Sequence, residues 1–254
     1  MTCLVTATAV AAGAGARSLL LGAAILCGQT SIGWANDYVD TDRDRLVHRR
    51  DKPLATGELT AATVGRAASV ALTLTVPLSL AVGAVSGAAH LVAVGSGWMY
   101  DLGLKQTWAS WVPYALSFGL LPVIIAGALP GHPRPQPLIV GVAACLGVAA
   151  HFANTVGDAA EDERTGVRGL PQRLGPRTSV LVAAVVVVVA ALLLAVATRG
   201  AAASIAAAGV SIGALPFAML TTGRRHSAFG AVITAAGAMV VAFVVAGGDH
   251  LTRR

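Results

Sequence analysis

Residues 19–44 read LLLGAAILCGQTSIGWANDYVDTDRD, and this stretch decides what kind of fold the chain can adopt. Its first part is almost wholly apolar, and a helix needs about 20 apolar residues to cross a hydrocarbon layer of about 30 Å. Its last eleven residues hold four aspartates, and ionisable groups are unfavourable inside such a layer. The stretch therefore predicts a membrane helix that runs into an acidic segment at one membrane surface.

The rest of the chain has the same character. Of its 254 residues, 56% are hydrophobic and only 12% are charged, a composition typical of membrane proteins with several spans. Helices satisfy their backbone groups within lipid, so we expect an all-α polytopic membrane protein with about nine transmembrane helices in two similar halves around a central cavity. The predicted helices cover residues 2–16, 18–38, 59–82, 85–101, 109–129, 136–157, 179–198, 200–222 and 226–248.

The first of these runs is short. Fifteen helical residues extend about 22 Å, less than the hydrocarbon layer. We therefore expect the first helix to be incomplete, or the true start of the chain to lie upstream. The three cysteines, Cys3, Cys27 and Cys145, all lie in apolar runs, which indicates no disulfide framework.

The basic residues predict an orientation. If the N-terminus is cytoplasmic and nine helices cross, thirteen of the eighteen lysines and arginines fall on the cytoplasmic side, as the positive-inside rule requires. We therefore expect a multi-pass protein of the cell membrane whose acidic loops are cytoplasmic. The net charge of +6 needs no nucleic-acid partner, because basic residues at helix ends face anionic lipid.

The acidic segment occurs twice. Residues 34–57 and 152–175 align without a gap at an offset of 118 residues. Such internal repeats commonly build a site between two bundles of a membrane protein, here a single domain with halves of about 1–110 and 111–254. The identical pairs are Ala35/Ala153, Asn36/Asn154, Asp40/Asp158, Asp44/Asp162, Arg50/Arg168, Pro53/Pro171 and Gly57/Gly175.

The shared pattern, N-x3-D-x3-D, predicts two polar stripes, because residues four apart lie on one helix face. Asn36, Asp40 and Asp44 form the first stripe, and the second consists of Asn154, Asp158 and Asp162. Facing stripes would bring four carboxylates together, and a divalent cation would remove their repulsion. Carboxylate and amide oxygens suit Mg²⁺, which binds few carboxylates together with substrate phosphates.

Other charges near the repeat have two interpretations. Arginines and lysines of the same loops could bind a diphosphate, although lipid headgroup contact explains Arg50 and Arg168 nearly as well. For Asp42, Glu58, Glu161 and Glu163 we favour a solvated helix end. The residues alone thus predict a Mg²⁺-diphosphate site at the cytoplasmic end of a membrane bundle.

At these residues the chain resembles the UbiA superfamily of membrane prenyltransferases. The family motif NDxxDxxxD is matched by Asn36, Asp37, Asp40 and Asp44, and DxxxD by Asp158 and Asp162. DKPLATG at 51–57 and the loop from Tyr100 to Lys105 are also similar to the family. The resemblance covers nearly the whole chain. The family's fuller first helix and the arginine-bearing segment before it are not matched.

The resemblance implies transfer of an isoprenyl group from an allylic diphosphate to an acceptor, usually an aromatic ring but for some members another lipid. Asp37, Asp40, Asp158 and Asp162 would be catalytic. One Mg²⁺ would bind Asn36, Asp40 and Asp44, and a second would bind Asn154, Asp158 and Asp162. The substrate-binding residues would be Asn36, Arg50, Lys52, Tyr100, Lys105, Asn154 and Arg168.

Three other functions share these features. A member of the same family could transfer a phosphoribosyl group to a polyprenyl phosphate. A transporter could use intramembrane acids and a repeat, although transporter acids usually lie near the midplane. The chain could also be an inactive relative that only binds lipid.

Overall fold

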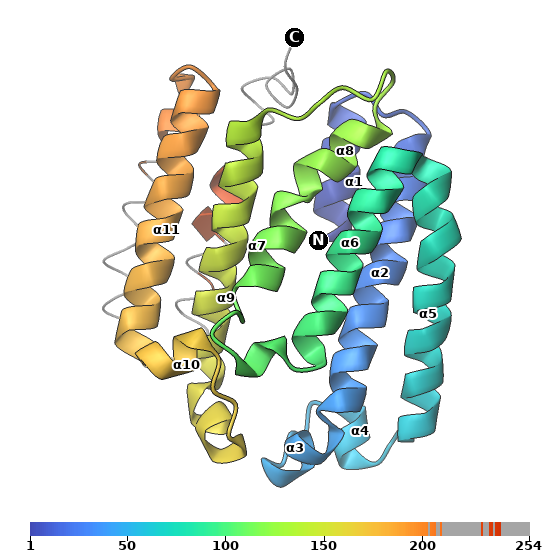
Figure 1. The fold of residues 1–254 in the computed structure, drawn as a ribbon, viewed down its shortest axis with the longest axis vertical. Helices are drawn as coiled ribbons and strands as arrows, with labels where there is room; N and C mark the ends of the chain where they lie inside the picture. Colours follow the sequence, from blue (N-terminus) through green and yellow to red (C-terminus); the bar gives the residue numbers. More distant parts are fainter. Residues whose placement is uncertain (203, 207–208, 210–229, 231–233, 236, 240–254) are drawn as a thin grey trace.

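The computed structural model describes residues 1–202, 204–206, 209, 230, 234–235 and 237–239, without the side chains of Ala160 and Glu161. The predicted helices 200–222 and 226–248 fall largely outside these residues. Within the described part every regular element is a helix (Figure 1). The elements are α1 Thr2–Ala11, α2 Arg17–Val39, α3 Thr41–Leu46, α4 Pro53–Thr56, α5 Ala61–Val82, α6 Ala84–Asp101, η1 Leu104–Gln106, α7 Val112–Gly119, α8 Leu121–Ala128, α9 Pro137–Thr165, α10 Leu170–Leu174 and α11 Pro176–Ala197.

Four of the described helices are long and apolar enough to cross a membrane. They are α2, α5, α9 as far as Ala159, and α11. The predicted all-α membrane class is therefore confirmed, whereas the count of nine helices stays a prediction. α9 is longer than the predicted run 136–157 because the acidic residues after Ala159 continue the same helix to Thr165. Gly166, at φ 73° in the left-handed region, then ends it.

The predicted single helix 109–129 is divided into α7 and α8. The break falls at Leu120, two residues before Pro122. Proline has no N–H to donate to the carbonyl of Phe118 four residues back, and its ring disturbs the preceding turn. The predicted apolar helix 109–129 is therefore present in two pieces, and both remain apolar.

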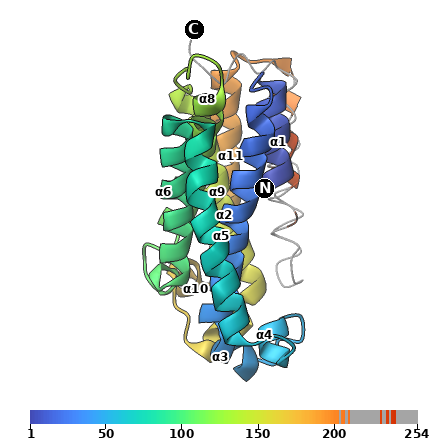
Figure 2. The ribbon, with the colours of Figure 1, turned by 90° about the vertical axis from the view of Figure 1, so that its right-hand side faces the viewer.

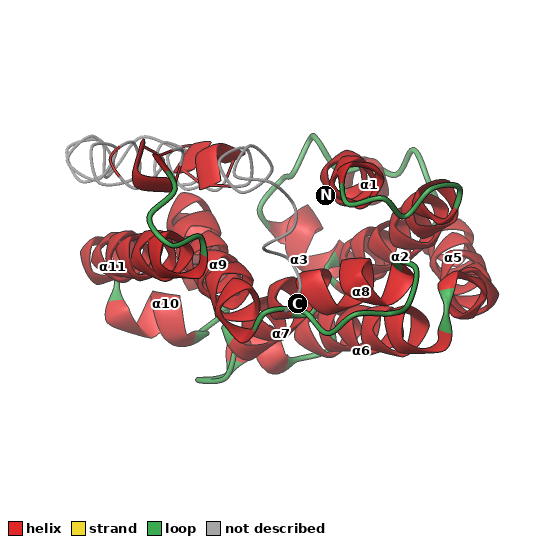
Figure 3. Ribbon diagram, turned by 90° about the horizontal axis from the view of Figure 1, so that it is seen from above, coloured by secondary structure: helices red, strands yellow, loops and turns green. Residues whose placement is uncertain are grey.

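The long helices stand side by side, and short helices gather at one end of them. α2 packs chiefly against α5, and α9 against α11. α1 lies against α2, where Gly22 permits close approach because a Cβ there would lie 2.5 Å from the Thr6 hydroxyl. Figure 2 shows α3, α4 and α10 at the lower end, and Figure 3 shows α7 and α8 between α9 and α6. The two acidic segments thus reach the same end of the bundle.

Candidate functional site

A cavity of about 430 Å³ lies between α2, α6, α7, α8 and α9. Its inner walls are mostly apolar, with Ile25, Ile32, Val94, Phe118 and Ile124 among the lining residues and with Gln29, His90 and Ser117 between them. Its other end is strongly polar. All six residues of the two stripes line it: Asn36, Asp40, Asp44, Asn154, Asp158 and Asp162.

The first stripe spans a change of helix. α2 ends at Val39 and α3 begins at Thr41, yet the backbone N–H of Asp40 still donates to Asn36 at 2.9 Å and that of Asp44 to Asp40 at 2.8 Å. The four-residue spacing therefore keeps these side chains on one side. The Asn36 Nδ2 donates to Asp40 Oδ2 at 3.0 Å. Asp44 is buried, and burial raises the pKa of its carboxyl above the ordinary value.

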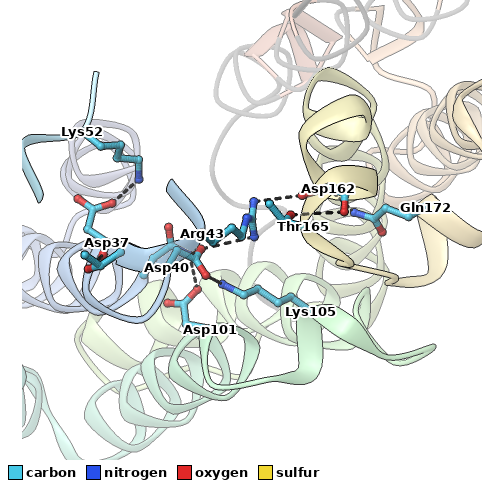
Figure 4. A network of polar contacts seen from close by, with 11 residues as sticks. Asp37, Asp40, Arg43, Lys52, Asp101, Lys105, Asp162, Thr165 and Gln172 are labelled. Atoms are coloured by element: carbon cyan, nitrogen blue, oxygen red, sulfur yellow. Dashed lines mark hydrogen bonds and ion pairs between the residues drawn. The ribbon is translucent and has the colours of Figure 1, made fainter. Parts of the chain in front are cut away.

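Two lysines pair with carboxylates of the first acidic segment. Lys105, in η1, is only 6% exposed and donates from Nζ to Asp40 Oδ1 at 2.5 Å. Asp37 forms an ion pair with Lys52 (Figure 4). Asp37 is not among the residues that line the cavity, whereas Lys52 and Lys105 are.

The second stripe lies within the continuous helix α9. Asp162 is 4% exposed, and burial raises the pKa of its carboxyl. Its Oδ1 accepts a hydrogen bond from Arg43 Nη2 at 3.1 Å, and its Oδ2 accepts one from Gln172 Nε2 at 2.7 Å. Asn154 and Asp158 make no side-chain hydrogen bond or ion pair to other described residues.

Arg43 connects the two stripes. Its guanidinium lies 3.1 Å from Asp162 and 3.7 Å from Asp40, so one cation from α3 neutralises a carboxylate of each stripe (Figure 4). Its position could have been noticed from the sequence, because Arg43 follows Asp40 by three residues. Nothing in the sequence, however, indicates that it reaches α9.

The predicted diphosphate-binding residues divide into two groups. Lys52, Tyr100 and Lys105 line the cavity. Arg50 and Arg168 are exposed and are not among its lining residues. The structure adds cavity-lining residues that the motif analysis did not select: Arg43, Arg49, Asp101, Tyr114 and Gln172.

The donors fit a Mg²⁺ site with few protein ligands. Among the described residues no three His, Cys, Asp or Glu side chains converge on one point, so neither stripe forms a cage made of protein alone. Mg²⁺ usually keeps waters and binds one or two carboxylates together with substrate phosphate oxygens. Each stripe can supply such a small set: Asn36 and Asp40 in the first, and Asn154 and Asp158 in the second.

Fold and cavity together define a polytopic α-helical membrane protein with an acidic, amide-bearing site at one end of an apolar cavity. The chain belongs to the UbiA prenyltransferase family, whose family model matches residues 1–228. The predicted superfamily is thereby confirmed. No curated protein sequence matches the chain significantly.

Solved structures share the fold. A UbiA homolog from Archaeoglobus fulgidus bound to DMAPP and Mg²⁺ has a TM-score of 0.74 at 18% identity, covering 98% of this chain and 95% of that one. An apo UbiA homolog from Aeropyrum pernix K1 has a TM-score of 0.74 at 16% identity, with 96% and 95% coverage. A structure described for digeranylgeranylglyceryl phosphate synthase in membranes has a TM-score of 0.69 at 15% identity, with 96% and 91% coverage.

Proposed function

We propose that this protein is a Mg²⁺-dependent intramembrane prenyltransferase that moves an isoprenyl group from an allylic diphosphate to an electron-rich, aromatic acceptor and releases pyrophosphate. The observation that carries the proposal is the juxtaposition of two Asn/Asp stripes and an apolar interior in one cavity. A structural neighbour from Archaeoglobus fulgidus was solved with GPP and Mg²⁺, ligands of the same chemical class. The protein would lie in the cell membrane, with the polar end of the cavity facing the cytoplasm.

The residues at the polar end of the cavity would have two roles, metal binding and diphosphate binding. Asn36, Asp40 and Asp44 would hold one Mg²⁺, and Asn154, Asp158 and Asp162 the second. Bound there, the metal would act as a Lewis acid that neutralises charge on the diphosphate. Lys52, Lys105 and Arg43 lie at the same end of the cavity and would bind diphosphate oxygens by charge-assisted hydrogen bonds.

The apolar walls would exclude water from the reacting carbon. Asn36 and Ile25 both line the cavity from α2 and lie eleven residues apart, so the lined stretch is roughly 16 Å long at 1.5 Å per residue. As the C–O bond to the diphosphate breaks, the allylic carbon becomes cationic, and a dry environment protects it from hydrolysis. The acceptor forms the new bond to this carbon and loses a proton.

Product analysis tests this function. The purified protein is incubated with Mg²⁺, a phenol or naphthoate acceptor, and geranyl, farnesyl or geranylgeranyl diphosphate, and products are identified by mass spectrometry. A prenylated acceptor with equimolar pyrophosphate supports the proposal. A lipid alcohol as acceptor and phosphoribosyl diphosphate as donor form separate arms of the assay. Unchanged activity in the double variant Asp40→Asn with Asp158→Asn would sink the two-stripe mechanism.

A further inference from the structure

Asp101 is a buried carboxylate that neither acidic motif includes. It is the last residue of α6, is 3% exposed and lines the cavity. Its Oδ1 accepts a hydrogen bond from Asn36 Nδ2 at 3.0 Å, whereas its Oδ2 is buried with no hydrogen-bond partner among the described residues. Burying a carboxylate with incomplete hydrogen bonding is unfavourable, so its position needs a reason.

The contact with Asp101 determines which way the Asn36 amide points. Asn36 Nδ2 donates both to Asp40 Oδ2 and to Asp101 Oδ1, each at 3.0 Å. Ionised carboxylates only accept hydrogen bonds, so the NH₂ group, and not the amide oxygen, must face these two neighbours. The amide oxygen of Asn36 is therefore turned away from both carboxylates, and Asn36 lines the cavity.

The segment 101–105 holds the first stripe at two points. Asp101 contacts Asn36, and Lys105 contacts Asp40 at 2.5 Å. Among the described residues, no carboxylate or ammonium group contacts Asn154 or Asp158 in this way. At the offset of 118 residues the chain has Met219 and Gly223, which carry neither a carboxylate nor an ammonium group. Within the described residues, the two stripes therefore have different polar contacts.

We infer that Asp101 is a positioning residue: by accepting the Asn36 N–H, it presents the Asn36 amide oxygen to a divalent cation bound at the first stripe. The inference rests on the proposed function only for the presence of that cation. Hydrogen-bond partners of metal ligands typically contribute about 10–100-fold to metal affinity. Asp101 contacts Asn36 of the first stripe and, among the described residues, no residue of the second, so it supports only one of the two sites.

A Mn²⁺ titration of the purified full-length protein, followed by the EPR signal of free Mn²⁺, tests this role without any turnover. Asp101→Leu is expected to weaken one class of Mn²⁺ sites about 10–100-fold and to leave the other unchanged. Asp101→Asn keeps an acceptor oxygen at the same place and should stay within about threefold of wild type. Asp42→Asn is the matched control, because it removes one exposed carboxylate from α3 outside the cavity lining.

A double-mutant cycle separates positioning from folding damage. If Asp101 acts through Asn36, Asp101→Leu should cause no further loss of Mn²⁺ affinity in an Asn36→Leu background. Full additivity of the two substitutions would overturn the inference. Wild-type Mn²⁺ affinity in Asp101→Leu would also overturn it. A loss of Mn²⁺ affinity in Asp101→Asn as large as that in Asp101→Leu would overturn it too, because it would indicate that Asp101 itself binds the metal. Absence of Mn²⁺ binding by the wild type would instead overturn the metal site of the proposed function.

Discussion

The two acidic stripes have the same sequence pattern but different neighbours. Around the first stripe lie Lys52, Asp101 and Lys105, all from its own half of the chain. At the repeat offset of 118 residues these become Leu170, Met219 and Gly223. Asp162 of the second stripe instead takes its cation, Arg43, from the first half. The two stripes thus offer the same candidate metal ligands, whereas the charged residues that contact them differ.

Neutralising one carboxylate in each stripe should separate catalysis from stability. We expect Asp40→Asn and Asp158→Asn each to lower kcat/KM about 10²–10³-fold, the usual effect of removing a preorganised electrostatic contact. Only Asp40→Asn leaves a buried lysine, Lys105, without its carboxylate, which destabilises by about 3–5 kcal/mol. Steady-state kinetics and thermal unfolding in detergent measure both effects. Equal melting temperatures for the two variants would contradict the difference between the stripes.

Removing the cation that joins the stripes should have the next largest effect. Arg43→Met keeps an unbranched apolar stem but removes the guanidinium and its contacts with Asp40 and Asp162. Because hydrogen bonds to charged groups contribute about 1.5–3 kcal/mol, we expect a loss of stability of that order in the ligand-free protein. Thermal unfolding measures it. Arg45→Met is the control, because among the described residues Arg45 pairs only with the exposed Asp42 on α3.

Mg²⁺ should reverse part of the Arg43→Met defect if the carboxylates bind metal. Added Mg²⁺ supplies positive charge where the arginine is missing. Mg²⁺ should therefore raise the melting temperature of the variant more than that of the wild type. The same unfolding experiment, repeated with Ca²⁺ and with NaCl of equal ionic strength, distinguishes binding from screening. Equal gains in variant and wild type would argue against metal binding between the stripes.

The smallest effects concern the outer basic residues. Lys52→Ala should raise the KM for the diphosphate donor about tenfold, as expected from losing one charge-assisted hydrogen bond, because Lys52 lines the cavity. Arg50→Ala and Arg168→Ala remove exposed side chains outside the cavity lining and should change KM less than about twofold. Initial rates measured over a range of donor concentrations give the KM of each variant. A tenfold effect of Arg50→Ala would mean that the loop moves onto the substrate.

Several properties could be predicted because they depend on local geometry. The all-α membrane class follows from apolar runs about 20 residues long. The contact between Asn36 and Asp40 follows from helical spacing, since residues four apart are neighbours wherever the helix lies. The break between α7 and α8 also has a local cause, because Pro122 lies just after it. Arg50 and Arg168 were selected by their identity in the repeat, which carries no information about exposure.

By itself, the sequence of this protein determined its class, its family and the two stripes of candidate metal ligands, because each of these depends on the spacing of residues that lie close together in the sequence. Only the tertiary structure decided that both stripes line one cavity with an apolar interior. It also decided that Arg43 reaches α9, that Gln172 donates to Asp162, and that Asp101 orients Asn36. Asp101 and Asn36 are 65 positions apart, Arg43 and Asp162 are 119 positions apart, and Gln172 and Asp162 lie on different helices. Such contacts depend on how the helices pack against one another rather than on where each helix begins or ends.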